Sequence, residues 1–173
     1  DAEPGLEIVV SMSYASVVLN AATRAIEWDA WFSFGGVQIG DVDQDSRNEI
    51  VGRFAWDGIA IFDADLRLQK TTIPIFNTDA IKLADVDGDG SPEILYGDAQ
   101  HGSLHVLDGR NYGERFPIPN PGGGATRIAV GDADHNGTRE ILWGSGRNTT
   151  AADYLNVFGV NSQALEWRSE PVG

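Results

Sequence analysis

Three short segments of the sequence carry acidic residues at a spacing that suits a metal ion. Each segment begins with Asp-x-Asp and has Glu at its ninth position, at Asp41–Glu49, Asp85–Glu93 and Asp132–Glu140. Carboxylate and amide oxygens on one side of a tightly curled loop suit calcium, which takes about six to eight oxygen ligands. None of these residues is a soft ligand of the kind that favours zinc or copper. The three segments therefore predict calcium sites.

The second segment combines all the features that such a loop needs. Asp85, Asp87 and Asp89 offer side-chain oxygens, Gly90 permits the backbone to reverse, and Ser91 would lend its carbonyl. The Glu at the ninth position would close the site. The predicted ligands are Asp41, Asp43, Asp45, Arg47 and Glu49, then Asp85, Asp87, Asp89, Ser91 and Glu93, and finally Asp132, Asp134, Asn136, Thr138 and Glu140. We expect one Ca²⁺ in each segment, about three in all.

The copies of the segment are not equivalent. Ser46 stands where the other two segments have Gly90 and Gly137, so we expect strain in the first loop and a weaker site there. A further copy at the start of the chain, Asp1–Glu7, carries Pro4 and lacks the leading Asp, so we expect no site in it. The alternative for every copy is a solvated Asp-rich turn, because Asp and Gly favour turns without any metal.

The charge of the chain is concentrated in these copies. They hold 14 of the 26 acidic residues, a number equal to the formal net charge of −14, because the other 12 acidic residues equal the 12 Lys and Arg in number. A nucleic-acid binder needs clustered Lys and Arg, so this charge argues against that function. The chain has no Cys, which excludes disulfides and thiolate sites, and it has no apolar run long enough to span a membrane.

The acidic segments mark an internal repeat with four short strands in each period. The repeated Glu residues lie 42, 44 and 47 residues apart, in the range of a β-propeller blade. We therefore expect an all-β fold, a β-propeller of four-stranded antiparallel blades, at residues 1–33 (incomplete), 34–77, 78–122 and 123–173. The expected strands are Glu7–Ser11, Ser16–Asn20, Ala25–Asp29, Val37–Val42, Glu49–Phe54, Gly58–Phe62, Leu68–Ile73, Ile81–Val86, Glu93–Gly97, Ser103–Leu107, Glu114–Ile118, Arg127–Gly131, Glu140–Gly144, Tyr154–Val157 and Ala164–Arg168.

Three blades and most of a fourth do not close a ring. Propellers commonly have about six to eight blades and rarely four. An open arc would expose two sheet faces that normally meet neighbouring blades. We expect the remaining blades in a longer form of the chain, and the alternative is a partner chain that shares the ring.

The place of the Glu separates these loops from EF-hands. An EF-hand needs Glu at its twelfth position and helices on both sides, whereas the twelfth residues here are Gly52, Tyr96 and Trp143. Asp-x-Asp-x-Asp-Gly-x-x-Glu-Ile-Leu at the start of a strand instead resembles the FG-GAP and VCBS repeats of integrin alpha subunits and of many bacterial surface and secreted proteins. The resemblance covers essentially the whole chain. It implies a propeller with calcium in the loop between the first two strands of a blade, and Phe34-Gly35-Gly36 is the nearest match to the Phe-Gly signature.

The same resemblance implies where a ligand would bind. Ligands of that family usually meet the face opposite the calcium loops. Aromatic, amide and charged residues fall on that face here, a mixture that suits a sugar or a protein. The candidate ligand-binding residues are Trp31, Trp56, Asp57, Asp98, His101 and Arg147. For the Trp residues, including Trp143 and Trp167, the alternative is packing between blades.

These features favour a non-catalytic recognition or adhesion module that binds a glycan or a protein. Extracellular calcium is abundant enough to fill weak sites and resting cytosolic calcium is not, so we expect an extracellular, cell-surface or periplasmic location. One alternative is a secreted propeller enzyme such as a polysaccharide lyase, and another is a structural spacer in a large surface protein. The fold alone does not decide among them.

Overall fold

A computed structural model describes residues 5–30, 33–54, 58–75, 77–98, 102–146 and 152–172. Within these ranges the chain forms fifteen β-strands, and none of the described residues belongs to a helix long and apolar enough to cross a membrane. The strands are β1 (Glu7–Ser11), β2 (Ser16–Asn20), β3 (Ile26–Ala30), β4 (Phe34–Gly40), β5 (Glu49–Phe54), β6 (Gly58–Asp63), β7 (Gln69–Ile73), β8 (Thr78–Ala84), β9 (Glu93–Asp98), β10 (Leu104–Leu107), β11 (Glu114–Ile118), β12 (Ala125–Gly131), β13 (Glu140–Ser145), β14 (Tyr154–Gly159) and β15 (Ala164–Arg168).

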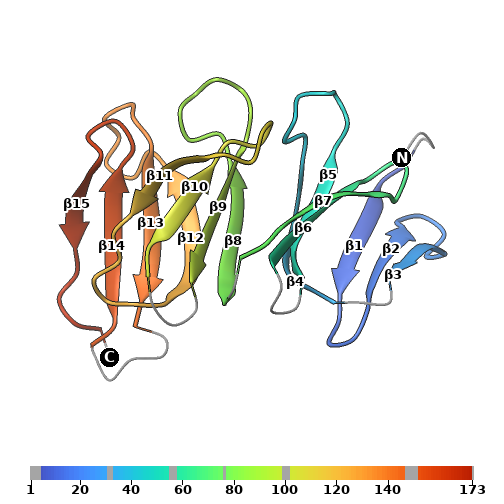
Figure 1. The fold of residues 1–173 in the computed structure, drawn as a ribbon, viewed down its shortest axis with the longest axis horizontal. Coiled ribbons are helices and arrows are strands. Elements are labelled where there is room, and N and C mark those ends of the chain that lie inside the picture. Colours follow the sequence, from blue (N-terminus) through green and yellow to red (C-terminus); the bar gives the residue numbers. More distant parts are fainter. Residues whose placement is uncertain are drawn as a thin grey trace.

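The strands form four antiparallel sheets in chain order. The first sheet has the order β1-β2-β3, the second β4-β5-β6-β7, the third β8-β9-β10-β11 and the fourth β12-β13-β14-β15. Each strand therefore pairs only with its sequence neighbours, as in a meander. The sheets follow one another across the molecule from the N-terminal to the C-terminal side (Figure 1). The predicted all-β architecture of three four-stranded units and one incomplete unit is confirmed.

The first strand of the second and third sheets differs slightly from its predicted position. β4 and β8 begin three residues earlier than expected, and they end two residues before Val42 and Val86. The amides of these two Val residues donate to the side chains of Glu49 and Glu93, at 2.9 Å each, instead of to a neighbouring strand. An alternating sequence pattern does not show whether a backbone amide bonds to a side chain or to a neighbouring strand. The predicted strands therefore extend too far into the acidic loops.

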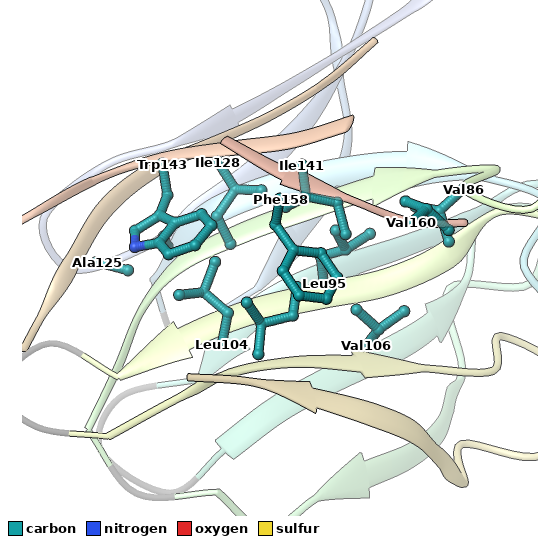
Figure 2. Close-up of a cluster of buried hydrophobic side chains, with 12 residues drawn as sticks. Val86, Leu95, Leu104, Val106, Ala125, Ile128, Ile141, Trp143, Phe158 and Val160 are labelled. Carbon is teal, nitrogen blue, oxygen red and sulfur yellow. The ribbon is translucent and has the colours of Figure 1, made fainter. Parts of the chain in front are cut away.

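Buried hydrophobic side chains fill the spaces between neighbouring sheets. Phe34 and Phe62 lie in the cluster shared by the first and second sheets, with ring centroids 5.6 Å apart. Ile61 and Ile94, both fully buried, belong to the cluster between the second and third sheets. A third cluster surrounds Trp143 between the third and fourth sheets (Figure 2). Face-to-face packing of successive sheets thus fixes the place of each acidic loop relative to the next sheet.

Two Trp residues on the fourth sheet have different surroundings. Trp143 is 1% exposed and its indole donates to Asn120 Oδ1 at 3.0 Å, so it packs between sheets. Packing between blades was also the alternative for Trp167, but this residue is 51% exposed. Its place on β15, the outer strand of the last sheet, leaves it without a following sheet in this chain.

The outer strand of every sheet contains one extra residue opposite its partner strand. Register shifts occur between Val18 and Leu19 and at the corresponding places in the other three sheets. The extra residue is left outside the regular pairing, which is the property of a β-bulge. We call it the bulge residue, and from the first to the fourth sheet it is Glu27, Lys70, Arg115 and Glu166.

Candidate metal centres

Each acidic loop joins the first two strands of its sheet and is closed by its buried Glu. Glu49, Glu93 and Glu140 open the second strands and are at most 1% exposed. Their Oε2 atoms accept the backbone amide of the second loop residue at 2.9, 2.9 and 2.7 Å. A hydrogen bond to a carboxylate is stronger than one between neutral groups, so this contact ties the start of each loop to its end. The Oε1 atoms are left for other partners.

The remaining acidic side chains organise the turn between these ends. In all three loops Oδ2 of the leading Asp accepts the amide of the sixth loop residue, at 2.9 to 3.1 Å. The side chain at the fifth position accepts the amide of the seventh residue, at 2.7 to 2.9 Å. These repeated bonds curl the loop around its own carboxylates.

The resulting clusters have dimensions that fit a calcium ion. In each loop three carboxylates offer oxygens that lie within 4.8 Å of one another. Calcium–oxygen bonds of about 2.3 to 2.6 Å place ligands on opposite sides of one ion about 5 Å apart. The clusters are Asp41, Asp43 and Asp45 in the first loop, Asp85, Asp87 and Glu93 in the second, and Asp132, Asp134 and Glu140 in the third. A bound ion would supply the positive charge that keeps these carboxylates together.

Two positions in every loop adopt a left-handed backbone. At the sixth position Ser46 has a φ of 70°, close to the 88° of Gly90 and the 86° of Gly137. Left-handed residues with a Cβ cost about 1 to 2 kcal/mol, so the strain expected at Ser46 is present. The fourth position is also left-handed, with Gln44 and His135 where the second loop has Gly88. The second loop thus has the least strained backbone of the three.

The first loop contains a lysine from the outer strand of its own sheet. Lys70 Nζ lies 3.0 Å from Glu49 Oε1 and 3.7 Å from Asp45 Oδ2, and it also contacts Asp43. Burial raises the pKa of Glu49. Burial by itself would lower the pKa of Lys70, but its hydrogen bonds to Asp43 and Glu49 outweigh that effect and hold the pKa above its ordinary value. Lys70 is therefore a permanent cation within the loop.

Three arginines surround the second loop. Arg115 contacts Glu93 and lies 2.6 Å from Asp87 Oδ2. Arg110 and Arg139 contact the other two carboxylates of the loop. Arg110 Nη2 lies 3.1 Å from Asp89 Oδ2, and Arg139 Nη2 lies 3.6 Å from Asp85 Oδ2. Every carboxylate of the loop that sequence features favoured most is thus already paired with a guanidinium group.

The third loop differs from the other two because its carboxylates form no ion pair with a Lys or Arg of the described residues. Within the described ranges, no Lys or Arg lies at ion-pair distance from Asp132, Asp134 or Glu140. Glu140 Oε1 instead receives a hydrogen bond from the Thr138 hydroxyl at 3.2 Å. A carboxylate that is buried and meets only a hydroxyl and an amide has its charge poorly compensated.

The structure brings together some of the predicted ligands and directs others elsewhere. The side chain of Arg47 lies 3.9 Å from Asp65, and Ser91 is buried with its hydroxyl 3.4 Å from the Val42 carbonyl. Lys70 and Arg115 were missed by the sequence reasoning. The signal that could have found them is a basic residue at the same place in two outer strands, but a bulge is not visible in an alternating pattern.

Most of the residues predicted to bind a ligand lie outside the described residues. These are Trp31, Trp56, Asp57, His101 and Arg147. Asp98 is described, and it ends β9 at the end of the strand remote from Glu93, paired in register with Thr78. It therefore lies at the end of the sheet opposite the acidic loop, and its role in ligand binding stays a prediction.

A polar pocket lies along the first strands of the three complete sheets, away from the acidic loops. It has a volume of about 520 Å³ and is lined by Gly36, Gln38, Arg53, Asp79, Ala80, Ile81, Lys82, Arg127 and Ile128. Arg53 Nη1 donates to the Thr78 carbonyl at 2.9 Å and lies 3.2 Å from Asp79 Oδ1. Three cationic side chains and one carboxylate make this a positive region in a chain of net charge −14.

Comparison with known families identifies the segment that contains the second and third loops. The family model for the FG-GAP-like repeat matches residues 85–143, which begin with the second acidic loop and end within β13. Residues 85–143 are therefore similar to an FG-GAP-like repeat. The identification agrees with the resemblance seen in the sequence. No curated protein is significantly similar to the chain in sequence.

Three solved structures are similar in fold to this chain. The V. cholerae biofilm matrix protein Bap1 matches with a TM-score of 0.66 and 16% identity, over 98% of this chain and 27% of that chain. The dihydro-heme d1 dehydrogenase NirN, in complex with DHE, matches with a TM-score of 0.69 and 14% identity, over 98% of this chain and 36% of that chain. A chain of the mitotic checkpoint complex matches with a TM-score of 0.64 and 11% identity, over 94% and 46%.

These likenesses concern the fold. Together with the four serial antiparallel sheets, they show that the chain consists of consecutive β-propeller blades. The chain spans between about a quarter and a half of the solved chains that it matches. The match to the FG-GAP-like repeat, at residues 85–143, covers parts of the third and fourth sheets.

Proposed function

We propose that this chain is the calcium-stabilised part of an extracellular or cell-surface β-propeller that recognises a glycan or a protein. The observation that carries the proposal is a division of the blades into two chemically different ends. The acidic loops lie at one end, between the first two strands of each blade. The polar, positively charged pocket lies along the first strands towards the other end.

Calcium in this proposal has a structural role. Each loop that forms only in the folded chain would couple calcium binding to folding, so the ion would stabilise the blade by mass action. Without metal, the third loop would hold three carboxylates close together with no Lys or Arg of the described residues paired to them, at a cost of about a kcal/mol or more for each close pair. Extracellular calcium concentrations suit sites of modest affinity, which supports an extracellular location.

The pocket favours a ligand that carries carboxylate or hydroxyl groups. Lys82 has no ion-pair partner among the described residues, and exposed Arg127 donates to the carbonyl of Thr126 at 2.7 Å. Both side chains are therefore available to an acidic group, and Gln38 adds an amide to the same pocket. Acidic sugars and acidic protein segments have the required chemistry. Asp98 and the five predicted residues outside the described ranges stay candidates for the rim of this face.

A glycan array with neutral and acidic sugars tests the recognition function. We expect binding by the wild-type chain and loss of acidic ligands when Lys82→Gln and Arg127→Gln are combined. Arg24→Gln is the matched control, because Arg24 is exposed and lies in the turn between β2 and β3, away from the pocket. Binding that survives the double substitution would place the ligand elsewhere. Absence of glycan and protein ligands in array and pull-down experiments would favour a structural spacer.

A further inference from the structure

The bulge residue sets whether the ninth-position Glu of an acidic loop has a cationic partner on the outer strand of its own blade. We infer that Lys70 and Arg115 are tethered counter-ions that compete with calcium for their loops, so the loop at Asp132–Glu140 binds calcium most tightly. This inference rests on the proposed calcium binding. It reverses the order expected from the sequence, in which the loop at Asp85–Glu93 has the most complete set of ligands.

The register of the outer strands places the bulge residue identically in every blade. In the second blade Phe62 pairs with Gln69 and Ile61 with Thr71, which leaves Lys70 as the extra residue. The third blade has the same irregularity at Arg115, between the partners of Leu107 and Val106. Since both basic side chains come from equivalent backbone positions and both reach the ninth-position Glu, their placement follows from the blade geometry.

The contacts of these two cations are with the predicted ligand atoms themselves. Lys70 lies 3.0 Å from Oε1 of Glu49, and Arg115 contacts Oε1 of Glu93. In each case Oε2 of the same carboxylate is already bonded to the loop backbone at 2.9 Å. A calcium ion that used the ninth-position Glu would therefore have to displace the ammonium or guanidinium group from Oε1. Displacement of an ion pair whose carboxylate is at most 1% exposed opposes binding.

The second loop is the most neutralised of the three. Its four carboxylates meet three guanidinium groups, from Arg115, Arg110 and Arg139. The first loop has four carboxylates and one ammonium group, from Lys70. Calcium affinity in oxygen-ligand loops is tuned by the number of ligand charges. The remaining negative charge thus ranks the first loop above the second, although the backbone of the second loop is less strained.

The fourth blade has an acidic side chain at the bulge position. Leu165 and Trp167 pair with Phe158 and Val157, which leaves Glu166 as the extra residue. Oε1 of Glu166 accepts a hydrogen bond from the Ser162 hydroxyl at 2.7 Å. The loop of this blade therefore keeps its full negative charge, with buried Glu140 uncompensated by any Lys or Arg of the described residues.

The test measures calcium binding to the 173-residue chain by isothermal titration calorimetry, with bound ions counted by native mass spectrometry. For the wild type we expect one tight site, which Asp134→Asn abolishes. Lys70→Met and Arg115→Met keep the length and apolar stem of each side chain without its charge. Each should add or tighten one site by at least about tenfold, which corresponds to about 1.4 kcal/mol, because a unit charge about 4 Å away contributes more than this near a protein surface. Arg24→Met is the control and should change nothing.

The reciprocal substitution places a cation at the bulge position of the fourth blade. Glu166→Lys should weaken the tight site by at least about tenfold, and Glu166→Gln should weaken it far less. This variant keeps the inference testable if Lys70→Met or Arg115→Met does not fold, which circular dichroism in EDTA would reveal. Both Glu166 substitutions leave every predicted ligand in place, so a change in affinity reports the charge at the bulge.

The outcomes separate this inference from the proposed function. Calcium binding that is equal in wild type, Lys70→Met, Arg115→Met and Glu166→Lys would overturn the inference and leave the calcium proposal intact. Loss of the tight site on Asp87→Asn, with Asp134→Asn unaffected, would also overturn it. If the wild type and all variants bind no calcium, the proposed calcium-stabilised function fails, and the inference fails with it.

Discussion

Replacement of Glu140 with Gln should separate the structural role of this side chain from its role in binding calcium. Glu140 is 1% exposed, Oε2 accepts the Ala133 amide at 2.7 Å, and Oε1 receives the Thr138 hydroxyl at 3.2 Å. A Gln carbonyl oxygen keeps the bond to Ala133, and the Gln amide group can donate to the Thr138 oxygen. Without calcium we therefore expect the free energy of unfolding to change by less than about 1 kcal/mol.

Calcium should reveal the difference between the two side chains. A ligand present at about 100 times its Kd stabilises the folded state by about 2.7 kcal/mol. For a chain of this length about 1 kcal/mol corresponds to about 2 to 4 °C in Tm, so filling the tight site should raise the wild-type Tm by about 5 to 10 °C. Glu140→Gln removes the only buried carboxylate of that loop and should lose most of this increase.

Thermal unfolding followed by Trp fluorescence, in EDTA and in calcium at about 100 times the Kd of the tight site, measures both effects. Glu170→Gln is the matched control, since Glu170 is exposed in the same blade and should retain the full shift. If Glu140→Gln retained the whole calcium shift, Glu140 would not be a ligand. A fall in Tm of more than about 4 °C in EDTA would contradict the reasoning that Gln preserves the loop.

Three further predictions concern the fold that holds the loops. Ser46→Gly should raise the free energy of unfolding in EDTA by about 0.5 to 1 kcal/mol, because Ser46 has a φ of 70°, and a lower value in urea unfolding would contradict the strain. Trp143→Ala should cost about 3 to 5 kcal/mol and Trp167→Ala far less, since only the first Trp is fully buried, and equal losses would contradict this packing. Burial, assisted by Glu114, raises the pKa of Tyr96 from 10.0 to about 12, so the folded state holds this proton more tightly than the unfolded state. The resulting stability is complete below pH 10.0 and is lost as the pH rises towards about 12, so Tyr96→Phe should unfold at a higher pH than the wild type in an alkaline titration followed by circular dichroism.

The sequence was sufficient for the architecture because the same physical pattern occurs several times. Each acidic loop lies between two apolar runs, which stand at the same distance from the loop in every complete copy. The strands on either side of Asp85–Glu93 could therefore be placed by comparison with the other copies. The errors lie at the ends of the first strands. There Val42 and Val86 look like strand residues, but their amides bond to buried carboxylates.

The sequence was not sufficient to rank the three loops. Ligand types and glycines favoured the loop at Asp85–Glu93, and its backbone is indeed the least strained. The cations that oppose metal binding there come from Arg110, Arg115 and Arg139, which are distant in sequence from most of the carboxylates they meet. Which cation approaches which loop depends on strand register and on the packing of the next blade, and neither is encoded in the loop itself.

The bond between each ninth-position Glu and its loop amide also gives every blade a separate spectroscopic signal. The amides of Val42, Val86 and Ala133 donate to carboxylates that are at most 1% exposed. Amide protons in short charge-assisted hydrogen bonds resonate at low field and exchange slowly with solvent. Three resolved proton resonances would therefore follow the filling of three sites one by one in a single calcium titration.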